Sequence, residues 1–259
     1  MLKLSDIVTE AAEDAAQRMA WDNYERSALE LIDEQYLAVA ARLSLTERQA
    51  LVAQSHKNAK ALGFVTGRDH LKYLSAVFFW GSFFTTDPQF YQALLRAGWL
   101  DAPGHRPSLT RLAHEIDLYA DATGGDLASY SRFMDALAGI YRDADTQPAL
   151  QTVCDSCARV WPHRAARLGP DGLAGFVAAA GKRAHGYGLA GPDLTLFCAL
   201  ALYFGYGFDC DPLYPWAVQA FAPSSGADQP DPEQWRRGMV SGVRAFFDAR
   251  QTAKGTEAT

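Results

Sequence analysis

Two aspartates recur in the same setting, and their side chains are the best placed for acid–base or metal chemistry. Asp87 and Asp211 each precede a proline, and Asp209 stands close to the second. A symmetric pair of acids could hold a metal ion or act as general acid and base. Asp before Pro is also a common helix start, where the carboxylate accepts hydrogen bonds from free backbone N–H groups. Because Asp231-Pro232 repeats the pattern before another helix-like segment, the sequence favours a structural role for these aspartates.

Cysteine and histidine spacings do not indicate a metal site. Cys154 and Cys157 form a C-x-x-C pair, but zinc requires a second pair of ligands and a redox role requires a β-α-β context. Cys198 and Cys210 do not have zinc-ligand spacing, so all four cysteines are expected to be buried free thiols. Among the six histidines, His114 has acidic neighbours at helical spacing, a pairing that is common by chance. We therefore predict no metal and no cofactor.

Motifs for nucleophilic catalysis and phosphate binding are missing from the sequence. It contains no G-x-S-x-G, no P-loop and no G-x-G-x-x-G after a strand-like run. The glycine-rich stretch from Gly186 to Gly191 follows a helix-like segment and predicts a turn between helices. The sequence therefore predicts a protein that is not an enzyme, with no catalytic residues.

Composition restricts the class of partner. The 259 residues carry a net charge of −6, which disfavours nucleic acid because phosphate binding needs a basic surface. The longest apolar runs are shorter than the about 20 residues that span a bilayer, so no membrane span is expected. Four cysteines are too few for a disulfide scaffold, and the chain opens without an apolar leader. These features predict a cytoplasmic protein.

One stretch of the chain occurs twice, at a constant offset of 124 positions. Residues 69–88 align without a gap with residues 193–212, and an aromatic residue follows soon after each. Repetition of this kind indicates two copies of one structural unit. The shared pattern is G-x-x-F-x-x-D-P, formed by Gly81, Phe84, Asp87 and Pro88 in the first copy and by Gly205, Phe208, Asp211 and Pro212 in the second.

Helical periodicity and helix-start signals run through the whole chain, so we predict an all-α fold of about ten or eleven helices. Helix starts are expected at Ser44, where Glu47 has capping-box spacing, at Thr66, and at Gly169-Pro170. Residues 1–259 are expected to form one domain built from two repeats, 26–100 and 151–221, packed with pseudo-two-fold symmetry. Residues 108–142 are expected to form a pair of linker helices, and residues 232–251 a C-terminal helix. A helix is expected from Ser5 toward Ala20, and the helical pattern is expected to continue from Tyr24 to Leu43.

The repeated glycines are predicted to lie inside the two aromatic helices, the first of which should end near Phe84 or Thr85. A glycine in a helix interior costs about 1 kcal/mol relative to alanine. The repetition of that cost at Gly81 and Gly205 suggests that another backbone approaches closely at both positions. We expect the two aromatic helices to cross near these glycines.

The aromatic residues exceed what one core helix per unit needs. They could form core, line a pocket for an apolar ligand, or contribute an exposed surface for a protein partner. The four rings next to the repeated motif are candidate partner-binding residues: Tyr91, Trp99, Tyr214 and Trp216.

The second copy of the motif resembles a known pattern. It reads G-x-x-F-D-x-D-P-x-x-P-W-A from Gly205 to Ala217, preceded by Gly188-Leu189. This pattern looks like one in helical accessory proteins encoded beside bacterial type VI secretion effectors and spike proteins. The first copy departs from it, with Tyr91-Gln92-Ala93 in place of Pro-Trp-Ala. The resemblance covers about half the chain, implies an accessory role near effectors, and carries over no catalytic residues.

Two classes of function fit these features. The favoured one is a non-enzymatic chaperone or loading adaptor that binds a secreted effector, with an immunity protein that neutralises a toxin by direct binding as a close alternative. The other class is an enzyme or small-ligand-binding protein that uses a cavity between the repeats. A deep pocket with convergent polar groups and shifted pKa values would favour the second class, and an apolar surface groove the first.

Overall fold

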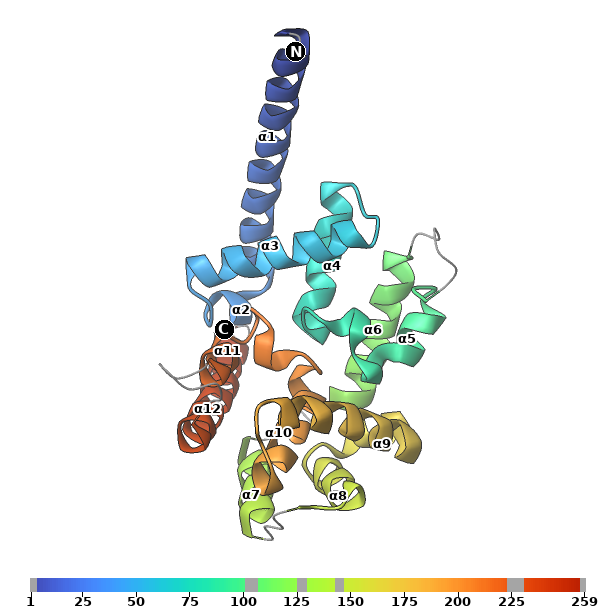
Figure 1. Cartoon of the computed structure of the whole chain (residues 1–259), viewed down its shortest axis with the longest axis vertical. Coiled ribbons are helices and arrows are strands. Elements are labelled where there is room, and N and C mark those ends of the chain that lie inside the picture. Colours follow the sequence, from blue (N-terminus) through green and yellow to red (C-terminus); the bar gives the residue numbers. More distant parts are fainter. Residues whose placement is uncertain (1–3, 101–106, 125–129, 143–146, 223–230, 257–259) are drawn as a thin grey trace.

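The computed structural model describes residues 4–100, 107–124, 130–142, 147–222 and 231–256. Within these ranges every regular element is a helix, which confirms the predicted all-α class (Figure 1). The α-helices are α1 (Leu4–Gln35), α2 (Leu37–Ala40), α3 (Leu45–Ala61), α4 (Gly67–Trp80), α5 (Tyr91–Arg96), α6 (Leu109–Thr123), α7 (Tyr130–Arg142), α8 (Leu150–Val160), α9 (Pro162–Gly186), α10 (Gly191–Phe204), α11 (Pro215–Phe221) and α12 (Pro232–Thr256). Three short 3₁₀ turns are η1 (Phe84–Thr86), η2 (Pro88–Phe90) and η4 (Phe208–Cys210).

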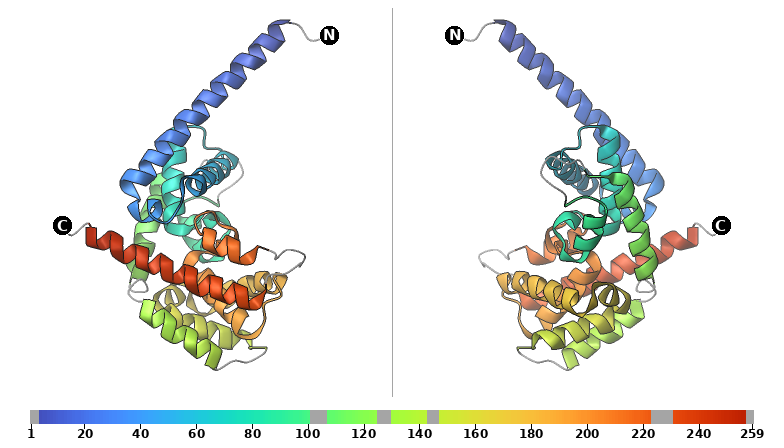
Figure 2. Two further views of the ribbon diagram at one scale, coloured as in Figure 1. Left: turned by 90° about the vertical axis from the view of Figure 1, so that its left-hand side faces the viewer. Right: turned by 90° about the vertical axis from the view of Figure 1, so that its right-hand side faces the viewer.

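Helix α1 ends at Gln35, and Tyr36 separates it from α2, so the expected continuous helix from Tyr24 to Leu43 is wrong. Helix α1 itself is unbroken over 32 residues, including the segment from Ala20 to Tyr24. That segment contains no glycine or proline, and nothing in it would stop a helix. At the C-terminal end of α1, Tyr24, Ala28 and Ile32 share one face, are buried, and pack toward α3 and α4. The N-terminal half extends beyond the other helices as an arm (Figure 2). Every side chain from residue 12 to 20 is exposed.

Predicted helix starts are confirmed at several places. Ser44 and Glu47 form a complete capping box at the start of α3. Thr66 accepts a hydrogen bond from the backbone of Asp69 at the start of α4. The side chain of Asp231 accepts one from Glu233 N at 3.0 Å, and α12 then continues beyond the expected end at residue 251 to Thr256.

The two aromatic helices end earlier than expected. Helix α4 stops at Trp80 and α10 at Phe204, so Gly81 and Gly205 follow the helices as C-caps. The expectation that these glycines lie inside helices is therefore wrong. Their φ angles of 82° and 103°, with ψ near 160°, belong to a region that only glycine occupies freely, and this conformation ends each helix.

Helix α10 is the centre of the second unit, because every side chain from Leu194 to Phe204 is buried. It packs against α7, α8 and α9, and in Figure 1 these helices lie around it in the lower half of the molecule. The buried apolar side chains of both units belong to one cluster that extends from Tyr24 to Phe247. No helix among the described residues is long and apolar enough to cross a membrane.

The two expected linker helices, α6 and α7, have different neighbours. Helix α6 packs against α4 and α5 and also against α9, whereas α7 packs against α8 and α10. Helix α6 therefore contacts both units, and the role of the two helices as a linker pair stays a prediction. Helix α9 is broken at Gly169, where a φ of 69° and a following proline interrupt it, as the Gly-Pro signal predicts.

Candidate functional site

The repeated motif forms a junction in which each unit's aspartate binds the other unit's backbone. Asp211 Oδ2 accepts a hydrogen bond from Ser82 N at 2.7 Å, and its Oδ1 accepts one from Ser82 Oγ at 2.6 Å. Asp87 Oδ2 accepts a hydrogen bond from Tyr206 N at 2.7 Å. Ser82 and Tyr206 are equivalent positions at the offset of 124, and each directly follows a motif glycine. The motif therefore links the two units.

The glycines make this approach possible. A Cβ atom on Gly81 would lie 3.1 Å from Asp211 Oδ2 and 3.4 Å from the carbonyl oxygen of Phe204. A Cβ atom on Gly205 would lie 3.4 Å from the carbonyl oxygen of Trp80 and 3.6 Å from Asp87 Oδ2. The predicted close approach of backbones is confirmed. The two helices meet at their C-terminal ends rather than crossing, and pseudo-two-fold symmetry of the whole units stays a prediction.

Each aspartate also accepts a hydrogen bond within its own unit. Asp87 Oδ1 accepts one from Gln89 N at 2.9 Å, which makes Asp87 the N-cap of η2 as predicted. Asp211 Oδ1 accepts the equivalent bond from Leu213 N at 2.9 Å. A turn follows Asp211-Pro212, and α11 begins only at Pro215, so the expected helix directly after Pro212 is wrong.

Burial shifts the proton affinity of both carboxyl groups. Enclosure in the protein raises the pKa of Asp87 to about 6, against the lowering effect of its hydrogen bonds from Tyr206 and Gln89. Burial also raises the pKa of Asp211, and its donors at Ser82 and Leu213 oppose that rise. Both groups are largely enclosed, with 2% and 1% of their surface exposed. Asp87 also borders a second cavity, of about 770 Å³, together with Pro88 and Gln89.

The remaining motif residues are structural as well. Phe84 and Phe208 are fully buried, and Phe208 lies 5.2 Å, between ring centroids, from Phe197 of α10. Pro88 is the first residue of η2, where its fixed φ fits the helix start. Each residue that the repeat singles out therefore has a structural role, and among them Asp87 and Pro88 also border the second cavity.

A chain of hydrogen bonds leads from Asp87 to a cavity. Gln89 Nε2 donates to Asp87 Oδ2 at 2.8 Å, and Gln89 Oε1 accepts from Tyr119 Oη at 2.9 Å. Arg164 Nη1 in turn donates to Tyr119 Oη at 2.8 Å and to the carbonyl oxygen of Leu202 at 3.3 Å. Tyr119 and Arg164 line the cavity, so the junction and the cavity share one polar network.

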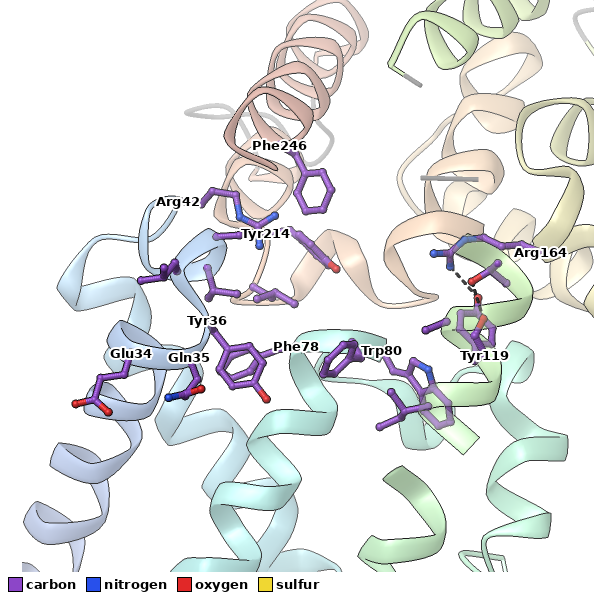
Figure 3. Close-up of a pocket in the computed structure, with 18 residues that line it drawn as sticks. Glu34, Gln35, Tyr36, Arg42, Phe78, Trp80, Tyr119, Arg164, Tyr214 and Phe246 are labelled. Carbon is purple, nitrogen blue, oxygen red and sulfur yellow. Dashed lines mark hydrogen bonds between the residues drawn. The ribbon is translucent and has the colours of Figure 1, made fainter. Parts of the chain in front are cut away.

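This cavity, which we call the inter-unit pocket, has a volume of about 520 Å³ and lies between the base of α1, α4, α6, α9, the segment before α11, and α12 (Figure 3). A volume in this range suits a small organic ligand. Its lining residues are Glu34, Gln35, Tyr36, Leu37, Ala38, Val39, Arg42, Phe78, Phe79, Trp80, Ile116, Tyr119, Ala120, Thr123, Arg164, Leu213, Tyr214 and Phe246.

Two arginines bring positive charge to the inter-unit pocket. The guanidinium carbon of Arg42 lies 4.3 Å from the centre of the Phe246 ring, and that of Arg164 lies 4.6 Å from the Tyr203 ring centre. Both distances are within the range of cation–π attraction. The only carboxylate among the described lining residues is Glu34, whose side chain is exposed. The pocket lining therefore has a net positive charge.

The four candidate partner-binding rings occupy different environments. Tyr91 is 54% exposed, as a partner-binding ring should be. Trp99 packs 5.6 Å from Phe84 and donates from Nε1 to the carbonyl oxygen of Ser108, and Trp216 packs 5.2 Å from Phe204. Tyr214 is buried and lines the inter-unit pocket, so the expectation of an exposed ring is wrong there. Its place next to Asp211 in the junction explains the burial.

Cysteines and histidines form no metal site within the described residues. Cys154, Cys157 and Cys198 are buried free thiols as predicted. Cys210 is exposed, which contradicts the prediction, and its Sγ lies 3.1 Å from Arg183 Nη2. Burial raises the pKa of all four thiols, so none is activated as a nucleophile.

The sequence analysis missed the residues that define the inter-unit pocket. Arg42, Tyr119 and Arg164 come from separate segments, belong to no motif, and meet only in the folded chain. Gln89 does not line the pocket but accepts the hydrogen bond from Tyr119. Their residue types alone gave no signal that could have found them. Comparison of the chain with protein-family models, curated proteins and solved structures finds no match.

Proposed function

We propose that this chain is a non-enzymatic binding protein that engages a protein partner through the arm of α1. The observation that carries this proposal is the exposure of every side chain from residue 12 to 20, in a helix that extends beyond the body. Most of the stability of a helix in a protein comes from the packing of one face, and the side chains from residue 12 to 20 have no buried face. A partner that covers the arm would supply that packing.

The charge of α1 indicates what kind of partner fits. The helix has two basic residues, Arg18 and Arg26, against nine acidic ones. The acidic residues are Asp6, Glu10, Glu13, Asp14, Asp22, Glu25, Glu30, Asp33 and Glu34. Among the described side chains, six of these acids are exposed: Glu13, Asp14, Asp22, Glu30, Asp33 and Glu34. Such a surface attracts a basic segment and raises its association rate at low ionic strength. We therefore propose a partner with a lysine- or arginine-rich segment.

The chemistry of the body supports a binding role. The carboxyl groups with raised pKa values, Asp87 and Asp211, are buried and do not line the inter-unit pocket. Among its described lining residues there is no serine, cysteine, histidine or aspartate to act as nucleophile or base. The lining of the pocket therefore favours the binding of a ligand over catalysis.

The G-x-x-F-x-x-D-P motif resembles one in accessory proteins encoded beside type VI secretion effectors, and this resemblance supports a secreted effector as the partner. In this proposal the partner is a secreted effector of a type VI secretion system, and the protein acts as its chaperone or loading adaptor. An immunity role makes a different prediction, because a bound toxin would then lose its activity. A toxicity-rescue assay with the captured partner separates the two roles.

Site-specific cross-linking tests the arm. A photoreactive amino acid replaces Ala16 in the native host, and cross-linked proteins are identified by mass spectrometry. The charge-reversal variant Glu13→Lys/Asp14→Lys should reduce capture of the specific partner about tenfold or more. The matched control Asp135→Lys/Asp171→Lys makes the same change in net charge at exposed positions away from the arm and should leave capture unchanged. Equal capture by both variants would contradict the proposal.

A further inference from the structure

The inter-unit pocket offers a binding site that is independent of the arm. It lies where the two units meet the base of α1 and the helix α12, so residues from distant parts of the sequence converge on it (Figure 3). Its volume of about 520 Å³ falls within the range typical of small-ligand sites.

Aromatic rings form much of its wall. The rings of Tyr36 and Phe78 lie 4.2 Å apart between centroids, and those of Tyr214 and Phe246 lie 6.2 Å apart. Rings of this kind provide flat faces on which an apolar or aromatic body can stack. Burial raises the pKa of Tyr214, so that wall residue stays neutral at physiological pH.

Polar groups converge on the same space. Figure 3 shows Arg42 and Arg164 on opposite sides of the pocket, the first beside Tyr214 and Phe246 and the second beside Tyr119. The indole N–H of Trp80, a lining residue only 3% exposed, has no hydrogen-bond acceptor among the described residues. Because this nitrogen is itself enclosed by protein atoms, the charge that a ligand would meet comes from the two guanidinium groups.

We propose that the inter-unit pocket binds an organic anion with a flat apolar body, the class that includes aromatic carboxylates and sulfonates. The two guanidinium groups select negative charge, because their hydrogen bonds to anions are stronger than those between neutral groups. The aromatic walls select a flat, apolar body. A cation of the same shape would be repelled by both arginines, and a simple inorganic anion would leave the rings without contact. This site goes beyond the partner-binding function and does not depend on it.

Two fluorescent probes of similar shape test charge and shape separately. The anionic probe is 8-anilinonaphthalene-1-sulfonate, and the neutral probe is N-phenyl-1-naphthylamine. The full-length protein should bind one anionic probe per chain, and its affinity should fall as NaCl is raised, because salt screens the attraction. The affinity for the neutral probe should be weaker and insensitive to salt.

Variants locate the probe. Arg42→Gln/Arg164→Gln should weaken the anionic probe about tenfold or more, the effect of losing a charge-assisted hydrogen bond, while the neutral probe changes little. Ala120→Trp adds a large side chain at the lining and should displace both probes. Arg244→Gln removes an exposed arginine on α12 outside the pocket and is the matched control, expected to bind both probes as the wild type does.

Three results would each overturn the proposal. The first is unchanged affinity for the anionic probe in a folded Arg42→Gln/Arg164→Gln variant. The second is retention of the probe by Ala120→Trp. The third is equal salt dependence, or equal affinity, of the two probes for the wild-type protein. This last comparison needs no variant, so it decides the matter even if the arginine substitutions prevent folding.

Discussion

Asp87 and Asp211 occupy equivalent positions in the two units and differ in what they connect. Each accepts one backbone hydrogen bond from the other unit and one from its own unit. The third bond differs, because Asp211 takes it from the hydroxyl of Ser82 and Asp87 takes it from the side chain of Gln89. Ser82 completes the junction, whereas Gln89 extends it toward the inter-unit pocket.

The difference lies in one pair of equivalent positions, 89 and 213. Gln89 continues the network through Tyr119 to Arg164, while Leu213 has no side-chain polar group and itself lines the inter-unit pocket. The two copies thus share a structural joint, and one of them connects that joint to the candidate binding site. A repeated motif can therefore stabilise the fold in both units, while one residue that differs between the copies, Gln89 in place of Leu, connects one unit to the candidate binding site.

The largest effect should come from removing either junction carboxylate. Asp87→Ala and Asp211→Ala each leave two buried backbone N–H groups without acceptors, and each such group costs about 1–3 kcal/mol. We expect a loss of about 2–5 kcal/mol in the free energy of unfolding, measured by urea denaturation. The control Asp231→Ala removes an exposed helix cap and should cost only about 0.5–2 kcal/mol. Equal losses in all three variants would show that the bonds between units add nothing.

The pH dependence of stability should come next in size. Since the pKa of Asp87 is about 6 in the folded protein and 3.8 is the ordinary value, the folded state binds the proton more tightly. Its contribution to stability is fully present below about pH 4 and is lost as pH rises through about 6, a change of up to about 3 kcal/mol. The stability of wild type minus that of Asp87→Asn should therefore increase as pH falls from 7 to about 4. Parallel curves for the two proteins would contradict this assignment.

Substitution of the junction glycines should have a smaller and graded effect. Gly81→Ala should cost more than Gly205→Ala, because its Cβ would approach a carboxylate oxygen at 3.1 Å while the nearest atom to the other lies at 3.4 Å. Both also adopt a backbone conformation that costs alanine about 1–3 kcal/mol. Gly63→Ala is the control, since Gly63 has a φ of 82° and no neighbouring atom within 4 Å. Urea denaturation measures the loss in the free energy of unfolding. If this loss is no larger for Gly81→Ala than for Gly63→Ala, the close approach of Gly81 to Asp211 does not affect stability.

The smallest effect should come from making the two copies alike. Gln89→Leu places in the first unit the residue found in the second, and Asp87 keeps both backbone donors. We expect a loss of about 1–2 kcal/mol, since one hydrogen bond to a charged group is removed and Tyr119 loses its acceptor at residue 89. The exposed Gln92→Leu should change stability little. Calorimetric melting of the two variants compares them, and a neutral Gln89→Leu would show that the network to the pocket does not stabilise the fold.

The sequence predicted the features that depend on local physics. The capping box at Ser44, the helix starts and the all-α class follow from spacing and side-chain type, and the structure confirms them. The repeated Gly and Asp-Pro predicted both a close approach and a cap. The sequence did not predict that each carboxylate accepts a hydrogen bond from the backbone of the other unit, because that contact depends on how the two units pack.

The end of the aromatic helices and the pocket were beyond the reach of sequence reasoning for different reasons. Apolar residues continue past Trp80 and Phe204, so periodicity alone extends both helices, whereas the positive φ of the following glycine ends them. Arg42 lies between α2 and α3, and Arg164 lies in α9, so most of the first unit and helices α6 and α7 stand between them in the sequence. Neither residue lies in a motif. Such convergence of isolated residues appears only once the chain is folded.

The central claim is that Asp87 and Asp211 join the two units into one cooperative structure. Native-state hydrogen exchange of the Ser82 and Tyr206 amides tests it most directly, because these two N–H groups donate the bonds between units. The account predicts that both amides exchange with the same opening free energy, equal to that of global unfolding. Exchange of Ser82 at a clearly lower free energy than the amides of α10, with α10 still protected, would show that the units open independently and would contradict the claim.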